Sequence, residues 1–188
     1  MTKNIMIVGV GGQGTLLASR VLGNTVINEG YDVKVSEVHG MSQRGGSVVT
    51  YVKYGEKVYS PIIDKGEADV ILAFELLEAY RALPYLIKGG KMIVNAQQID
   101  PIPVITGAAQ YPADIAQKLA DVCDVTTVDA LTLAKQAGNQ KAVNIVLIGV
   151  MAKRSEIPYE KWVETLKATV PAKFLEVNLK AFELGYQL

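Results

Sequence analysis

The sequence predicts an α/β protein built on a Rossmann-like, doubly wound and mostly parallel β-sheet. Residues 5–10, I-M-I-V-G-V, carry one glycine among apolar side chains, which is typical of a parallel strand buried on both faces. Four glycines between positions 9 and 14 then form a turn, and residues 15–28 have apolar side chains at helical spacing. Strand, glycine turn and helix make the first half of a βαβ unit.

The next two predicted strands depart from a plain nucleotide-binding pattern. Residues 31–38 alternate between apolar and polar side chains, as a strand does. Residues 47–54 alternate in the same way, and residues 57–60 return after a tight turn at Gly55-Glu56. We therefore expect an inserted β-hairpin over residues 47–60, which a plain doubly wound domain lacks at this point.

Strands and helices alternate through the rest of the chain. Apolar runs predict strands over 69–74, 91–95 and 125–128 and a short strand over 104–106. Breaking residues such as Pro84 and Gly138 mark helix ends. The expected helices are 75–86, 113–122, 130–137 and 139–154, followed by two amphipathic C-terminal helices over 159–169 and 172–184.

Length and composition limit the function classes. The 188 residues are 49% hydrophobic and 20% charged, which is ordinary globular composition, and we expect one domain spanning residues 1–188. The formal net charge is +0 and no basic stripe is visible, which argues against a nucleic acid as partner. The longest apolar run, residues 145–152, is too short for a membrane crossing of roughly 20 residues. The first residues show no signal-peptide pattern, so we expect a cytoplasmic location.

The chain has a single cysteine and a single histidine. Cys123 alone forms no internal disulfide, which fits a reducing compartment. It also falls short of the roughly four thiolates that an iron–sulfur cluster takes. Because His39 is the only histidine, histidine-based zinc sites and Ser/His/Asp catalysis have little to draw on, and we expect no metal site.

The glycine turn admits three interpretations. The spacing Gly9-x-Gly11-x-x-Gly14 matches the dinucleotide fingerprint, and Glu37 stands about where the ribose-binding acid would be. Alternatively, the glycines only allow a tight turn and close packing of helix on strand. In the third interpretation, the exposed N–H groups at the helix start contact a ligand or a catalytic partner.

A second glycine-rich segment, S-E-V-H-G-M-S-Q-R-G-G over residues 36–46, follows a predicted strand. It is therefore expected at the carboxyl edge of the sheet, where open α/β sheets bind ligands. Arg44 suits a carboxylate or phosphate, and His39 can exchange a proton near neutral pH. The alternative is structural, with Arg44 in a salt bridge and His39 capping a turn. Neutral hydrogen-bonding groups come from Gln13, Ser42 and Gln43.

The two glycine-rich motifs resemble those of a known family. The segments G-V-G-G-Q-G, S-E-V-H-G-M-S-Q-R-G-G-S-V and V-Y-S-P-I-I, in this order, are similar to gamma-type subunits of 2-oxoacid:ferredoxin oxidoreductases. The resemblance covers nearly the whole chain and includes Asn144 and Gly149. Within the family, residues 39–46 and Tyr59-Ser60-Pro61 look closest to the small, beta-type subunits of indolepyruvate ferredoxin oxidoreductases.

The resemblance implies an accessory catalytic subunit. Complexes of this family decarboxylate a 2-oxoacid oxidatively, form an acyl-CoA and pass electrons to ferredoxin, using thiamine diphosphate, magnesium, iron–sulfur clusters and CoA. This chain has no Gly-Asp-Gly…Asn motif for the thiamine diphosphate and magnesium, and it has one thiol. We therefore expect it to bind none of these cofactors by itself, to be inactive alone, and to work with a larger subunit that holds them.

The resemblance also suggests which residues form the site. We expect His39 and Arg44 to shape a pocket for the 2-oxoacid or CoA at the partner's active site. The other residues expected to face a cofactor are Gly11, Gly12, Gln13, Gly14, Ser42, Gln43, Gly45 and Gly46.

Two other functions stay open at this point. The glycine spacing and Glu37 favour a stand-alone NAD(P)-binding oxidoreductase, but the inserted hairpin and the lack of an obvious Tyr/Lys or Cys/His pair oppose it. The second alternative is a non-catalytic scaffold subunit. Either kind of subunit predicts an extensive apolar surface that is exposed in the isolated chain, where a homodimer could also form.

Overall fold

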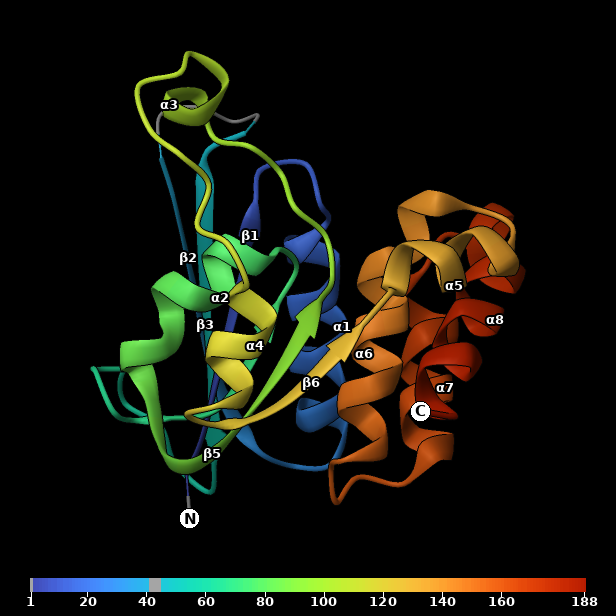
Figure 1. Ribbon diagram of the computed structural model, residues 1–188. Coiled ribbons are helices and arrows are strands. Elements are labelled where there is room, and N and C mark those ends of the chain that lie inside the picture. Colours follow the sequence, from blue (N-terminus) through green and yellow to red (C-terminus); the bar gives the residue numbers. More distant parts are fainter. Residues whose placement is uncertain (1, 41–44) are drawn as a thin grey trace.

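The computed structural model describes residues 2–40 and 45–188 and has a six-stranded sheet at its centre (Figure 1). The strand order is β2-β3-β1-β4-β5-β6, in which β3 is antiparallel to both β1 and β2 and the other pairs are parallel. The predicted mostly parallel α/β fold is therefore confirmed. The strands are β1 Lys3–Val10, β2 Asp32–His39, β3 Ser47–Gly55, β4 Ala68–Ala73, β5 Leu86–Asn95 and β6 Asp124–Val128.

Helices cover both faces of the sheet, as doubly wound folds require. Side chains alternate across β1, so Ile5 and Ile7 pack in the core with α1 and α5 to α8, whereas Met6 and Val8 pack with α2 and α4. The helices are α1 Thr15–Asn28, α2 Leu76–Ala82, α3 Ile102–Ile105, α4 Ile115–Ala120, α5 Ala130–Ala137, α6 Val143–Lys153, α7 Tyr159–Thr169 and α8 Leu175–Tyr186. Short 3-10 turns occur at Leu83–Tyr85, Gln140–Ala142 and Ala172–Phe174.

An antiparallel strand, β3, is inserted into the sheet as expected, but the predicted hairpin over residues 47–60 is wrong. Residues 56–60 form no strand, and β3 pairs instead with β2, the strand that precedes it in the chain. β3 thus lies between β1 and β2 and separates two strands that are adjacent in a plain nucleotide-binding domain.

A side chain, rather than a strand, holds the segment that follows β3. The N–H of Val58 donates to Asp32 Oδ2 at 3.0 Å, and the Nζ atoms of Lys34 and Lys57 lie 2.6 and 3.6 Å from the Asp32 carboxylate. The hydrogen bonds from Lys34 and Val58 lower the pKa of Asp32 to about 2. Asp32 therefore anchors the backbone of this segment at Val58.

The short strand predicted over residues 104–106 is also wrong, because this stretch belongs to a helical turn. The N–H groups of Val104 and Ile105 both donate to the carbonyl of Pro101, at 2.9 and 3.1 Å. Pro103 lies in the first turn of α3, where its fixed φ favours a helix. Pro84, by contrast, acts as predicted, because α2 ends at Ala82 and continues only as a 3-10 turn.

Two glycines allow α6 and α8 to cross at close range. A Cβ atom on Gly149 would lie 2.2 Å from the carbonyl oxygen of Phe182, and one on Gly185 would lie 2.0 Å from the carbonyl oxygen of Val146. Both neighbouring atoms are backbone, so neither side can yield without moving a helix. This crossing places α6, the most apolar helix, in the core.

We predict that Gly149→Ala and Gly185→Ala each lower the free energy of unfolding by about 2 kcal/mol or more, because overpacking forces the helices apart. Gly23→Ala in α1 is the matched control, since its Cβ would meet only Val35 at 3.9 Å. That variant should be neutral or stabilising by up to about 1 kcal/mol, from helix propensity. Urea unfolding measures all three, and equal stabilities would contradict the close crossing.

Candidate functional site

The two glycine-rich segments meet at the carboxyl edge of the parallel strands. The sheet register pairs Val10 at the end of β1 with Ser47, and His39 at the end of β2 with Val48. The N–H of Gly11 donates to the carbonyl of Gly46 at 2.9 Å. The fold therefore brings the glycine turn into direct contact with Gly46, the last residue of the 36–46 segment.

Gln13 closes the glycine turn and ties it to the next strand. Its Oε1 accepts a hydrogen bond from the N–H of Val10 at 2.7 Å, and its Nε2 donates to the carbonyl of Phe74 at 3.0 Å. Phe74 directly follows β4. The Gln13 amide thus positions the turn, and the ligand contact expected from the sequence stays a prediction.

The first turn of α1 faces the same edge. Gly14 is the N-cap residue with φ +83°, and no side chain caps the helix there. Asn144 of α6 donates from Nδ2 to the carbonyl of Gly14 at 3.2 Å, and a Cβ on Gly14 would lie 2.7 Å from the same nitrogen. The glycine leaves room for Asn144, and it leaves the amide groups of the helix start without a side-chain acceptor, an arrangement that suits an anion.

A buried carboxylate, which the sequence analysis missed, organises the edge beyond β4. Glu75 is 1% exposed. Its Oε2 accepts the N–H of Glu78 at 2.9 Å, while its Oε1 accepts the N–H of Ile99 at 3.1 Å and the hydroxyl of Tyr111. The Tyr111 hydroxyl in turn accepts the N–H of Leu77 at 3.0 Å. Burial, together with the Glu75 carboxylate, raises the pKa of Tyr111.

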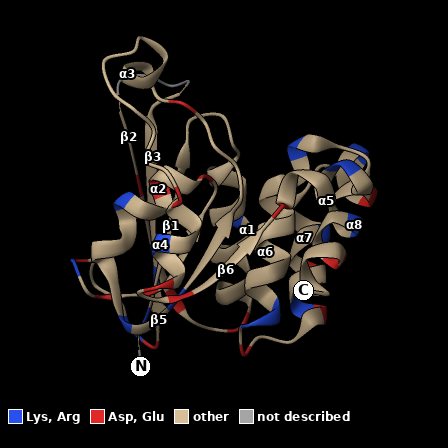
Figure 2. Cartoon of the chain, in the orientation of Figure 1, with Lys and Arg blue, Asp and Glu red and all other residues tan. Residues whose placement is uncertain are grey.

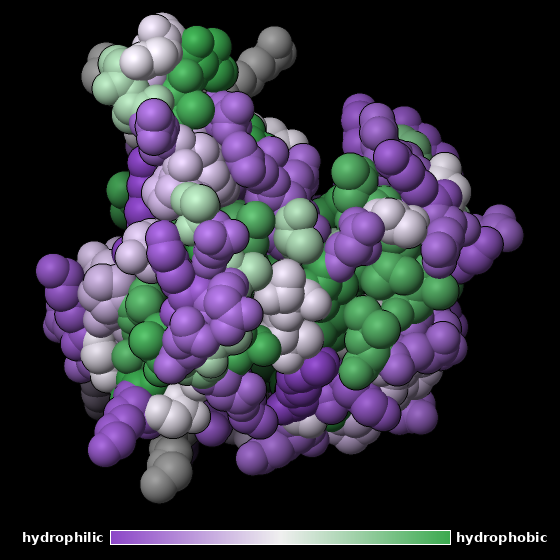
Figure 3. Space-filling view, viewed as in Figure 1, coloured by the Kyte–Doolittle hydropathy of each residue, from purple (hydrophilic) through white to green (hydrophobic). Residues whose placement is uncertain are grey.

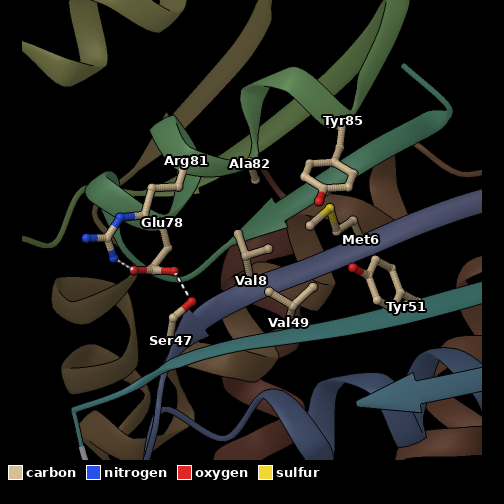
Figure 4. A pocket seen from close by; sticks show the side chains of 9 residues that line it. All are labelled: Met6, Val8, Ser47, Val49, Tyr51, Glu78, Arg81, Ala82 and Tyr85. Carbon is tan, nitrogen blue, oxygen red and sulfur yellow. Dashed lines mark hydrogen bonds and ion pairs between the residues drawn. The ribbon is translucent and has the colours of Figure 1, made fainter. Parts of the chain in front are cut away.

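Glu78 is a second buried carboxylate, beside Ser47 at the start of β3 (Figure 4). It accepts hydrogen bonds from Ser47 Oγ at 2.5 Å and from Arg81 at 2.6 Å. The adjoining cavity is about 100 Å³, whereas cofactor pockets are typically about 300–1,000 Å³. It therefore suits ordered water rather than a cofactor. Its other lining residues are Met6, Val8, Val49, Tyr51, Ala82 and Tyr85.

A larger cavity, of about 740 Å³, lies at the opposite, amino edge of the parallel strands. Its walls include Lys3 at the start of β1, Asp69 near the start of β4, and Arg154 just after α6. Among the residues that the structure describes, none of those predicted for the site lines this cavity. The cavity is therefore separate from the edge at which the glycine-rich segments meet.

The structure describes some of the remaining predicted site residues and not others. His39 is exposed at the end of β2, and Gly45 is exposed with φ +79°. Ser42, Gln43 and Arg44 lie outside the described residues. One signal for the missed Glu75 was present in the sequence: it directly follows a predicted strand and so had to lie at the carboxyl edge.

Glu37 does not stand where a dinucleotide-binding domain needs its acid. β3 separates β2 from β1, so Glu37 lies two strands away from the glycine turn. The Oγ1 of Thr50 also donates to its carboxylate at 3.1 Å. These two observations argue against the stand-alone NAD(P)-binding alternative.

Within residues 2–40 and 45–188, His, Cys, Asp and Glu side chains form no group of three or more that could hold a metal ion. Among the helices of the same residues, none has both the length and the apolar character for a membrane crossing.

Comparison with known proteins decides the family. Residues 4–188 match the family model described as pyruvate ferredoxin/flavodoxin oxidoreductase. The chain belongs to this family. It is 46% identical to indolepyruvate oxidoreductase subunit IorB of Thermococcus kodakarensis, over 97% of this chain and 93% of that protein. The predicted gamma-type accessory subunit of a 2-oxoacid:ferredoxin oxidoreductase is thereby confirmed.

Two further similarities concern the fold and the length of relatives. The gamma subunit of a keto/oxoacid ferredoxin oxidoreductase from Geobacter sulfurreducens superposes with a TM-score of 0.73 at 23% identity, covering 98% of this chain and 96% of that chain. Ketoisovalerate oxidoreductase subunit VorA of Methanothermobacter marburgensis is 27% identical over 96% of this chain, but the match spans only 35% of VorA. In that relative, this domain is part of a longer polypeptide.

We predict that Tyr111→Phe lowers the free energy of unfolding by about 1–3 kcal/mol, because the N–H of Leu77 loses its acceptor and Glu75 loses a donor. Tyr59→Phe is the matched control, since Tyr59 is 88% exposed and should change stability by less than about 0.5 kcal/mol. Chemical denaturation measures both variants. If the two curves coincide, the Glu75 network does not stabilise the fold.

Proposed function

We propose that this chain is the small subunit of an indolepyruvate or related aryl-pyruvate:ferredoxin oxidoreductase. The supporting observation is the 46% identity to an indolepyruvate oxidoreductase subunit over nearly the full length of both chains. The reaction is the oxidative decarboxylation of the 2-oxoacid to an acyl-CoA, with the electrons passed to ferredoxin. Residues 1–188 act as one domain, and the free thiol of Cys123 fits a reducing cytoplasm.

In the proposed complex, one chain binds the cofactors and the other helps to form the substrate pocket. This chain carries one cysteine, whereas an iron–sulfur cluster takes about four thiolates, and it lacks the motif that thiamine enzymes use for diphosphate and magnesium. We place thiamine diphosphate, magnesium and the clusters on a larger subunit. The small subunit contributes hydrogen-bond donors and shape to the substrate pocket, so it is inactive alone.

The carboxyl edge supplies those donors. The hydrogen bond from Gly11 to Gly46 holds the glycine turn beside the end of the 36–46 segment, and this contact supports the proposed site. The amide groups at the start of α1 favour an anion, and the Arg44 guanidinium pairs with the carboxylate of the 2-oxoacid or a phosphate of CoA. His39, exposed at the end of β2, provides a secondary polar contact.

We predict that Arg44→Ala in the assembled complex lowers kcat/KM for indolepyruvate by about 10- to 100-fold, the effect of losing a charge-assisted hydrogen-bond pair. His39→Ala should have a smaller effect. Arg154→Ala is the matched control, because it removes the same charge at the opposite edge of the sheet and should leave turnover unchanged. Ferredoxin-dependent turnover measures all three.

Two results would contradict the proposal. Full activity of Arg44→Ala and His39→Ala in an intact complex would leave the chain with a scaffolding role only. Reduction of a pyridine nucleotide by the isolated chain, or its tight binding of NADH in a calorimetric titration, would reject the subunit function altogether.

A further inference from the structure

A charge-free segment projects beyond the carboxyl edge of the sheet. Between β5 and α4 the chain extends outward and carries α3 at its far end (Figure 1). Residues 101–113 contain no Asp, Glu, Lys or Arg, and Figure 2 shows α3 itself in tan. At the tip, Ile102 is 67% and Ile105 is 71% exposed. Figure 3 shows green and pale side chains at the outer end of this projection.

The tip has a conformation of its own. The carbonyl of Pro101 accepts the N–H of Ile105, the carbonyl of Ile102 accepts the N–H and hydroxyl of Thr106, and the carbonyl of Pro103 accepts the N–H of Ala109. Ile102 and Ile105 stand three residues apart in a helical turn and so share one side of it. The tip is therefore a preformed apolar surface, which reduces the entropy that a partner would have to remove on binding.

Both ends of the projection are fastened to the candidate site. Glu75 accepts the N–H of Ile99 where the chain leaves the sheet and the hydroxyl of Tyr111 where it returns. Glu75 follows β4 directly, and the neighbouring carbonyl of Phe74 holds the glycine turn through Gln13. The tip is thus fixed relative to the edge at which Gly11 and Gly46 meet.

We propose that residues 101–111 dock into an apolar recess of the larger subunit, with Ile102 and Ile105 as the anchoring side chains. This inference rests on the proposed function. Large exposed apolar side chains gathered on one projection mark an interaction site. The partner's side of the contact is apolar, because residues 101–113 offer no charge to pair.

The position of the projection favours the larger subunit over a second copy of this chain. A stable interface engages about 20–30 residues on each side, so a projection of about half that size is one anchor within a wider surface. The carboxyl edge continues that surface directly. The relative VorA, in which this domain is joined to a longer polypeptide, shows that the fold occurs beside additional chain in this family.

The test uses the full chain and the larger subunit of the proposed complex. Ile102→Asp and Ile105→Asp should each weaken their association by at least about 30-fold, the effect of a charge at an interface hot spot. Val122→Asp is the matched control, because Val122 is 64% exposed and lies just before the start of β6, at the amino edge of the sheet opposite the tip. This variant should bind like the wild type. Thermal unfolding of each variant alone should match that of the wild type, since the altered side chains face solvent.

The outcomes separate this inference from the proposed function. If the wild-type chain does not bind the larger subunit, the proposed function fails. If the wild type and both isoleucine variants bind equally well, the proposed function stands and the docking of the tip is wrong. If instead the variants lose self-association in sedimentation while keeping full affinity for the larger subunit, a second copy covers the tip and the inference is overturned.

Discussion

The carbonyl oxygen of Phe74 is the acceptor on which the carboxyl edge of this protein depends. It receives Gln13 Nε2 at 3.0 Å and Asn95 Nδ2 at 3.1 Å, and so it joins the ends of β1, β4 and β5. Asn95 extends the connection, because its Oδ1 accepts the N–H of Ala130 at the start of α5 at 3.2 Å. Glu75, the next residue, then fixes the projecting segment. One short stretch after β4 therefore aligns the glycine turn, the sheet and the apolar tip.

Local sequence predicted most of the fold, because buried parallel strands and amphipathic helices have strong periodic patterns. The pairing of β3 was not predictable in this way. Gly55-Glu56 looks like a hairpin turn, whereas the true partner, β2, ends before a glycine-rich segment that carries no such turn signal. Residues 104–106 are Val, Ile and Thr, which favour a strand in isolation. The prolines at positions 101 and 103 instead place them in a helical turn.

The candidate site was predictable only in part, because several of its contacts join residues that are far apart in the sequence. Gly11 and Gly46 stand next to predicted strands, so topology alone placed them at one edge. The roles of Gln13, Glu75 and Tyr111 depend on partners 61, 24 and 36 residues away, and no local pattern encodes those contacts. From the sequence, polar side chains that follow a strand are all assigned to the same edge of the sheet. The structure then separates the side chains that hold this edge together from those that can face a ligand.

Hydrogen exchange on the chain alone and in complex with its larger subunit is the most direct test that the carboxyl edge faces the partner. The account predicts slower exchange, by about tenfold or more, at amides of residues 11–16, 45–47 and 99–111 upon assembly. It predicts no change at the amino edge, in residues 56–60 and 154–157. Protection confined to the amino edge, with the glycine turn and the projection exchanging as in the isolated chain, would contradict it.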